Sequence, residues 1–200
     1  HNGNLELCKR IIKSAKRAGA NCVKFQSFSE KSIFSKKVYE DNFFISDDYR
    51  NRSDTNLKKI VKKYSLSKKQ LIKIKKFCDQ VNIDFLVTPF SREEADFLDK
   101  KLKVDAFKIA SMDLNNYDFI SYVAKKNKPI ILSTGLSNSK EIKKAVKTIE
   151  KSGNKKLIIL HCVAIYPPKY EEINLNRIST LKKIYPYPIG FSDHSLGFEA

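Results

Sequence analysis

The chain has 200 residues, 42% of them hydrophobic and 11% aromatic, which is enough for one folded domain with a buried core. Its net charge of +17 could mark a nucleic-acid surface, but the lysines are scattered over many predicted helices and no nucleic-acid motif is present. Four cysteines without CxxC spacing and the lack of any apolar run of roughly 18 residues exclude a disulfide scaffold and a membrane protein, and predict a cytoplasmic location.

Six short apolar runs alternate along the chain with Lys/Glu-rich stretches of helical spacing. The expected helices are 5–17, 67–81, one opening at Ser91, 117–126, 139–151 and 178–184. The expected strands are 20–26, 83–88, 106–111, 129–133, 157–161 and 187–192. Ser67 and Ser91 each precede Gln or Glu by three residues, the capping-box pattern of a helix start. The stretch 27–65 is expected to be an irregular loop, of a length that is usually functional or partly disordered.

Strands that alternate with helices predict a parallel sheet, either open and doubly wound or part of a closed barrel. The barrel is favoured because every predicted strand, and not only two at a switch point, ends in polar residues. No strand is followed by a GxGxxG or GxxxxGK[ST] phosphate-binding loop. The prediction is therefore an α/β protein, a (β/α)8 TIM barrel that is incomplete here, with about six of its eight strands in residues 1–200.

Lys24 and Lys108 lie inside otherwise apolar predicted strands. A buried ammonium needs an anionic partner unless it reaches solvent at the strand end. Each lysine could therefore bind a phosphate or carboxylate, or form a Schiff base with a carbonyl substrate. Thr88, Ser111 and Ser133 follow strands just before helices, where one such residue is usually a helix cap. Together with two strand lysines they predict a pocket for an anion.

His161 and His194 end the last two predicted strands, which are expected to be neighbours. A single histidine at a strand end is usually structural. Two of them on adjacent strands, with Asp193 alongside, could bind a metal or transfer protons.

Seven motifs resemble, in order and spacing, those of the sialic acid synthase family, the N-acetylneuraminate synthases and their legionaminic and pseudaminic acid relatives. The resemblance spans the whole chain. The motifs are His1-Asn2-Gly3-Asn4, Lys24-Phe25-Gln26, Thr88-Pro89-Phe90, Lys108-Ile109-Ala110-Ser111, Leu132-Ser133-Thr134-Gly135, His161-Cys162 with Tyr166-Pro167, and Ser192-Asp193-His194.

The resemblance implies an enzyme that condenses phosphoenolpyruvate with an N-acetylated amino-sugar aldehyde, N-acetylmannosamine or a diacetamido-trideoxyhexose, to a nonulosonic acid and phosphate. It also implies a divalent metal, Mn²⁺ or Mg²⁺, and a homodimer of the full-length protein. By position, Gln26 matches a sugar contact and His194 a metal ligand, while His161 would line the site without binding the metal. The phosphoenolpyruvate-binding positions are matched by Lys24, Thr88, Lys108, Ser111, Ser133, Tyr166 and Ser192.

The chain departs from the family pattern in several places. The family's first strand with its catalytic Glu, its last strand with a second metal histidine, and its C-terminal antifreeze-like domain have no counterpart here. The chain is therefore expected to be a barrel fragment that is inactive alone. Asp113 stands where many members carry Glu, and Ala164 where some carry Asn.

The implied chemistry begins with attack of phosphoenolpyruvate C3 on the sugar aldehyde, which the metal polarises. Lys24 and Lys108 would hold the anionic groups, and water would capture the cationic C2 before phosphate leaves. Asp113 is a candidate to activate that water. Two other functions stay open: a Schiff-base aldolase on the same barrel with Lys108 as nucleophile, and a non-catalytic basic module that binds nucleic acid.

Overall fold

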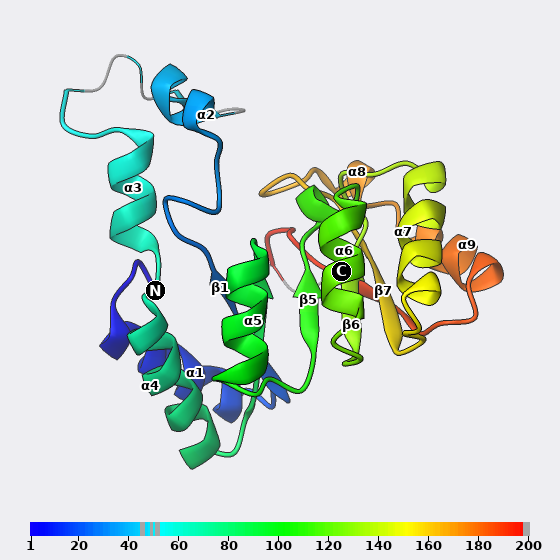
Figure 1. The fold of residues 1–200 in the computed structure, drawn as a ribbon, viewed down its shortest axis with the longest axis horizontal. Helices are drawn as coiled ribbons and strands as arrows, with labels where there is room; N and C mark the ends of the chain where they lie inside the picture. The colour runs from blue at the N-terminus through cyan, green and yellow to red at the C-terminus, as the bar shows by residue number, and fades with distance from the viewer. Residues whose placement is uncertain (45–46, 49, 51–52, 198–200) are drawn as a thin grey trace. The chain divides into compact units, whose positions relative to one another are not determined.

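The computed structural model describes residues 1–44, 47–48, 50 and 53–197 (Figure 1). These residues form two compact units, His1–Val104 and Asp105–Ala200. In both units every strand of the main sheet runs parallel to its neighbour, and helices connect consecutive strands.

Among the described residues of the first unit are two parallel strands of the main sheet and five helices. The strands are β1 (Cys22–Ser27) and β4 (Asp84–Pro89). The helices are α1 (Leu5–Arg17), α2 (Lys36–Asp41), α3 (Leu57–Tyr64), α4 (Lys68–Gln80) and α5 (Arg92–Lys100). A short antiparallel hairpin joins β2 (Phe43–Phe44) to β3 (Asp47–Asp48).

Two helices, α1 and α4, contribute completely buried side chains to the core of the first unit. Cys8 and Ile12 of α1, with Leu71, Ile74 and Cys78 of α4, are completely buried. These positions recur every three or four residues, so each helix presents one apolar stripe. The Asn4 side chain accepts a hydrogen bond from the Leu7 amide, and Ser67 opens α4 in a full capping box with Gln70, so the polar helix starts are satisfied.

The expectation of an irregular loop over 27–65 is wrong for much of that stretch. The structure places α2, the β2–β3 hairpin and α3 within it. Helix α3 buries Leu57 and Val61, one turn apart, and the Asn56 side chain caps its start. Helices of six and eight residues carry too little periodicity to be recognised among charged and aromatic neighbours.

The second unit is a four-stranded parallel sheet in the order β5-β6-β7-β8. The strands are β5 (Phe107–Ile109), β6 (Ile130–Ser133), β7 (Leu157–Cys162) and β8 (Ile189–Ser192). The helices are the 3₁₀ turn η1 (Ser111–Asp113), α6 (Tyr117–Ala124), α7 (Ser139–Lys151), α8 (Tyr170–Ile173) and α9 (Asn176–Ile184). Phe107, Ile130, Leu132 and Ile159 are completely buried and form the centre of its core.

All six predicted strands are present, and the predicted bounds of α1 and α7 are confirmed. Two details differ. Strand β5 ends at Ile109, because Ser111 already begins the 3₁₀ turn, and the four-residue α8 was not predicted. Within the described part of the chain, no helix has the length and hydrophobicity needed to cross a membrane.

Candidate active site

In the first unit, three of the predicted site residues share one face of the β1–β4 pair. Lys24 lies opposite Leu86 and Gln26 opposite Thr88 in the parallel register. Side chains alternate along a strand, so these residues point away from Val23 and Phe25, which are buried on the other face. The structure therefore brings Lys24, Gln26 and Thr88 together near the carboxyl ends of two neighbouring strands.

Lys24 has part of its side chain in solvent, as the outward positions of β1 do. Burial of the remainder beside the strand lowers the pKa of the Lys24 ammonium below its ordinary value, because the charged form is poorly solvated. An anionic ligand beside this ammonium would raise its pKa again, because a neighbouring negative charge stabilises the charged form. The pair β1–β4 thus presents a cation, an amide and a hydroxyl on one face.

In the second unit, Lys108 is the most deeply placed cation of the candidate site. It is only 5% exposed, and its ammonium donates hydrogen bonds to the Ser133 hydroxyl and, at 2.8 Å, to the Ile109 carbonyl. The ammonium therefore stays solvated by protein oxygens and not by water. The hydrogen bond joins Lys108 of β5 to Ser133 of β6, and both side chains lie on one face of the sheet.

The same face continues to the last strand. Lys108 pairs with Ile131, Ser133 with Leu160, and Cys162 with Ser192, so alternation places Lys108, Ser133, Cys162 and Ser192 on one side. Sequence reasoning gave Cys162 no role, although it lies between two predicted site residues. A cysteine at the end of an apolar run is ordinarily a small apolar core residue, so nothing in the sequence marked Cys162 as part of the site.

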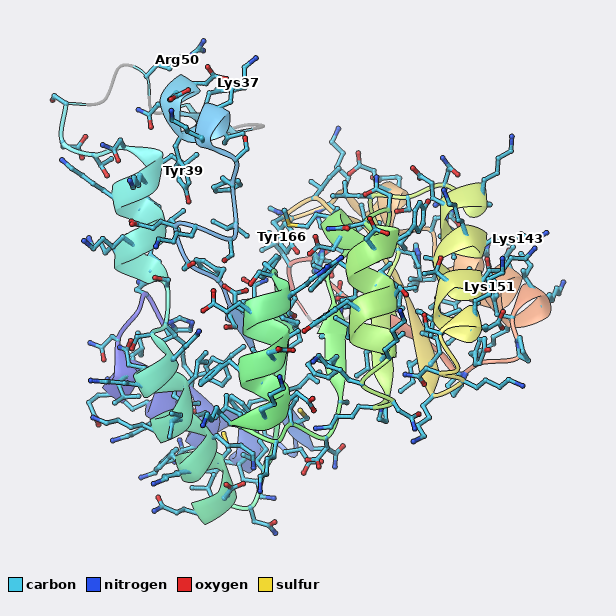
Figure 2. The ribbon with its side chains drawn as sticks, in the orientation of Figure 1. Lys37, Tyr39, Arg50, Lys143, Lys151 and Tyr166 are labelled. Atoms are coloured by element: carbon cyan, nitrogen blue, oxygen red, sulfur yellow. The ribbon has the colours of Figure 1, made fainter. Side chains whose placement is uncertain are left out.

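His194 lies in the loop after β8 with a defined orientation. Its Nδ1 donates to the Val163 carbonyl at 2.6 Å, and its ring stacks on Tyr166 with centroids 4.0 Å apart. Because Nδ1 carries the proton, Nε2 presents its lone pair, 3.4 Å from the Ser192 hydroxyl. Tyr166 is 76% exposed and lies in the loop after β7 (Figure 2). The Val163 carbonyl is a functional group that no side-chain pattern could have revealed.

Ser111 and Asp113 lie together in the η1 turn that follows β5. The turn is held by hydrogen bonds from the Asp113 amide to the Ala110 carbonyl and from the Leu114 amide to the Ser111 carbonyl, at 3.1 and 3.3 Å. Both side chains are half-buried. They follow Lys108 by three and five residues, at the carboxyl end of the same strand.

His161 is not brought into this group. It pairs with Phe191, so it lies on the opposite face of the sheet from Lys108, Ser133 and Ser192. There its ring stacks on Phe191 at 5.6 Å and its Nε2 donates to the Ile173 carbonyl at 2.7 Å. Its position at a strand end was visible in the sequence, but the face on which it lies was not.

The turn after β6 is packed tightly against the end of β7. A Cβ on Gly135 would meet the Cys162 sulfur at 2.7 Å and the Cys162 carbonyl oxygen at 3.0 Å. The neighbouring Thr134 binds β7 through its amide and hydroxyl, which both donate to the Leu160 carbonyl. Close packing here fixes the spacing of Ser133 from the β7 loop that carries Val163.

A divalent metal such as Mn²⁺ or Mg²⁺ requires oxygen or nitrogen donors. Among the residues it describes, no group of three His, Cys, Asp or Glu side chains lies together. His194 has the chemistry of one ligand, since its Nδ1 is held by a carbonyl and its Nε2 is presented.

Comparison with known proteins gives a consistent result. The NeuB family model matches residues 11–200. The chain is 40% identical over its full length to the uncharacterized protein MJ1065 of Methanocaldococcus jannaschii, of which it covers 54%. It is 37% identical over 98% of its length to the N,N'-diacetyllegionaminic acid synthase of Campylobacter jejuni, of which it covers 58%. The chain thus spans about half the length of the curated relatives it matches.

Solved structures confirm the predicted fold class. The N-acetylneuraminic acid synthetase of Leptospira borgpetersenii matches all of this chain with a TM-score of 0.85 at 34% identity, and 63% of that protein is covered. A truncated 3-deoxy-D-arabino-heptulosonate 7-phosphate synthase of Thermotoga maritima, a TIM-barrel enzyme, matches 97% of the chain with a TM-score of 0.65. Its 16% identity supports the α/β barrel fold alone.

Proposed function

Because this chain belongs to the NeuB family, we propose that it supplies most of the active site of an enzyme that joins phosphoenolpyruvate to an N-acetylated amino-sugar aldehyde. The sugar is N-acetylmannosamine or a diacetamido-trideoxyhexose, and the products are a nonulosonic acid and phosphate. The family relatives named as legionaminic acid synthase and sialic acid synthetase support this substrate class.

The observation that carries the proposal is the buried Lys108 ammonium on the Ser133 hydroxyl. A cation held by protein oxygens at the carboxyl ends of parallel strands is already oriented before an anion arrives. Phosphoenolpyruvate offers a phosphate and a carboxylate, and a charged hydrogen bond to either is among the stronger polar contacts. In the first unit, Lys24 provides the second cation, and Gln26 and Thr88 provide neutral hydrogen-bonding groups on the same face.

The remaining residues position the reactants. Ser111, Ser192 and Tyr166 are assigned to phosphoenolpyruvate, and Gln26 to the sugar. The enol C3 attacks the sugar aldehyde, and water then adds to C2 before the carbon–oxygen bond to phosphate breaks. Asp113, in the turn after β5, is assigned to accept a proton from that water. His161 lies on the other face of the sheet and is given no part in this reaction.

A divalent ion, Mn²⁺ or Mg²⁺, is proposed as the cofactor, with His194 Nε2 as one of its ligands. When bound, the ion would polarise the aldehyde oxygen as a Lewis acid. The hydrogen bond from Nδ1 to Val163 and the stacking on Tyr166 hold the ring in place for that role. The full-length protein is proposed to act as a homodimer, which sedimentation analysis would test.

The test is the Lys108→Ala variant of the full-length protein, assayed by phosphate release from phosphoenolpyruvate with N-acetylmannosamine or a diacetamido-trideoxyhexose. Loss of a charged contact of about 2–3 kcal/mol predicts a fall in kcat/KM of about two orders of magnitude. Lys125→Ala, at the exposed end of α6, is the matched control and keeps full activity. Near-normal activity of Lys108→Ala, with its fold verified by circular dichroism, would contradict the assignment of Lys108 to phosphoenolpyruvate binding.

The aldolase alternative is separated by a second measurement. A Schiff base between Lys108 and pyruvate would be trapped by borohydride as a stable adduct, whereas an ammonium that only binds anions would not. Mass spectrometry of the treated protein is expected to show no adduct at Lys108.

A further inference from the structure

A cavity of about 760 Å³ lies in the second unit and is lined by residues of both α7 and α9. It is lined by one face of α9, whose residues recur at intervals of three and four: Arg177, Thr180, Leu181 and Ile184. Opposite them are the loop before α7 and the first turn of that helix. His161 of β7 also lines the cavity. The cavity is therefore on the opposite face of the sheet from Lys108 and is separate from the candidate active site.

His161 provides the first sign of a ligand. The side chain is 3% exposed, and its Nε2 donates to the Ile173 carbonyl at 2.7 Å, so Nδ1 carries a lone pair. No residue in the described part of the chain forms a hydrogen bond with Nδ1. Because His161 lines the cavity, this nitrogen is available to a partner that is not part of the protein.

Charge provides the second sign. Arg177 forms no ion pair with any residue that the structure describes, although its helix face borders the cavity. Glu141 also lines the cavity, but its carboxylate is engaged in the capping box of α7, where it accepts a hydrogen bond from the Asn138 amide at 2.8 Å. The first turn of this 13-residue helix adds a partial positive charge at the same wall.

The rest of the lining is mixed. Leu136 and Ile184 are 56% and 57% exposed, and the buried side chains of Ile142 and Leu181 complete its apolar part. The polar part consists of Thr134, Ser137, Asn138, Ser139 and Thr180. A volume between about 300 and 1,000 Å³ that combines apolar side chains with convergent polar groups is in the range of small-molecule sites.

We propose that this cavity is a second ligand site, which binds a small organic anion, a carboxylate or a phosphate monoester with an apolar group. The guanidinium of Arg177 pairs with the anion. A proton from solvent moves onto His161 Nδ1, which then donates to the anion while Nε2 keeps its bond to Ile173. The apolar group lies against Leu136 and Ile184. This site does not depend on the reaction proposed above.

The test is calorimetric titration of the full-length protein with hexyl phosphate, hexanoate, inorganic phosphate and the neutral hexanamide. At least one of the two amphiphilic anions is expected to bind with a Kd below about 1 mM, and the stronger of the two identifies the anion class. Inorganic phosphate and hexanamide are expected to bind at least tenfold more weakly. Because an anion beside the imidazole favours its charged form, titrations in two buffers of different ionisation enthalpy are expected to show uptake of about one proton on binding.

Variants decide whether the bound anion is in this cavity. Arg177→Gln is expected to weaken binding at least tenfold, whereas Lys182→Gln, which removes a charge from the same helix away from the cavity, retains it. Binding must also persist in Lys108→Ala, which alters the opposite face. His161→Gln, where it folds, abolishes the proton uptake. Equal affinity in Arg177→Gln, loss of binding in Lys108→Ala, or binding only at tens of millimolar would overturn the proposal.

Discussion

At the scale of single residues, His194 shows how a main-chain atom sets side-chain chemistry. The Val163 carbonyl accepts a hydrogen bond from Nδ1 of the His194 ring, and stacking on Tyr166 restricts rotation of that ring. The remaining nitrogen, Nε2, keeps its lone pair and lies 3.4 Å from the Ser192 hydroxyl. An imidazole fixed in this tautomer loses little orientational freedom when it binds a metal.

His194→Ala should therefore weaken Mn²⁺ binding to the full-length protein by at least about tenfold. The control is His161→Gln, which alters the other face of the sheet and is expected to retain Mn²⁺ affinity. Electron paramagnetic resonance of free Mn²⁺ measures both. Equal losses in the two variants would mean that His161 is a ligand as well.

Glu94 is a buried carboxylate whose surroundings predict a pH dependence. It is 6% exposed and accepts hydrogen bonds from the Ser32 hydroxyl at 2.6 Å and the Phe90 amide at 2.8 Å. Burial raises the pKa of Glu94, and these hydrogen bonds only partly oppose that shift. A raised pKa means that folding favours the protonated form, so the stabilisation is present at low pH and is lost as pH rises through the folded-state pKa.

The free energy of unfolding of the wild type, relative to Glu94→Gln, is thus expected to fall as pH rises from about 4 to about 7. The adjacent Glu93 is a control of opposite sign, because its hydrogen bond to Lys68 lowers the pKa of Glu93. The stability difference between wild type and Glu93→Gln should shrink as pH falls. Urea unfolding from about pH 3 to about pH 7 measures both, because the Glu93 effect is lost below the ordinary carboxyl pKa. A flat profile for Glu94→Gln would contradict the argument.

At the scale of elements, Asn154 joins three segments of the second unit. It is 1% exposed, and its amide nitrogen donates to the Ala124 and Lys128 carbonyls at 3.3 and 2.8 Å. Its side-chain oxygen accepts from the Lys156 amide at 2.9 Å. The end of α6, the approach to β6 and the approach to β7 therefore share one side chain.

Asn154→Ala should destabilise the protein by about 2–3 kcal/mol, because it leaves buried main-chain groups without partners. Asn116→Ala is the comparison, since Asn116 is an exposed cap of α6 whose loss costs about 1 kcal/mol. Chemical denaturation of both variants gives the two values. A smaller effect at Asn154 than at Asn116 would show that water replaces the lost hydrogen bonds.

Elements with strong caps could be predicted from the sequence. Helix α7 begins after Asn138 and α4 after Ser67, and each has a capping box that local sequence specifies. The face of His161 could not be predicted. Strand alternation gives two faces within β7, but the face shared with Lys108 depends on the register of β5, β6 and β7, which is a property of the assembled sheet. The 3₁₀ turn at Ser111 was missed for a similar reason, because a three-residue turn has no periodicity.

At the scale of the whole molecule, the net charge of +17 comes mostly from lysines outside the candidate active site. Lys143 and Lys151 project from α7 into solvent (Figure 2). A positive field raises the encounter rate with an anionic substrate, and the effect is screened beyond about 10 Å at 0.1 M salt.

For phosphoenolpyruvate, kcat/KM is expected to fall as ionic strength rises. A double variant, Lys143→Glu with Lys151→Glu, should lower kcat/KM at low salt severalfold and flatten its salt dependence while kcat stays unchanged. Lys143→Arg with Lys151→Arg retains the charge and is the control. Steady-state kinetics from about 20 to about 500 mM salt measure the slopes, and equal slopes for the two double variants would rule out steering by this helix.

The close packing of Gly135 against Cys162 has a consequence for how this molecule can vary. A smaller residue at position 162 would remove the sulfur at 2.7 Å, but the carbonyl oxygen at 3.0 Å belongs to the main chain and remains whatever residue stands there. A substitution at 162 therefore relieves only one of the two contacts, and a side chain at 135 would still require the main chain of β7 to shift by a few tenths of an ångström. Position 135 is therefore restricted to glycine as long as the main chain of β7 keeps its place, and exchange of the neighbouring side chain alone does not lift that restriction.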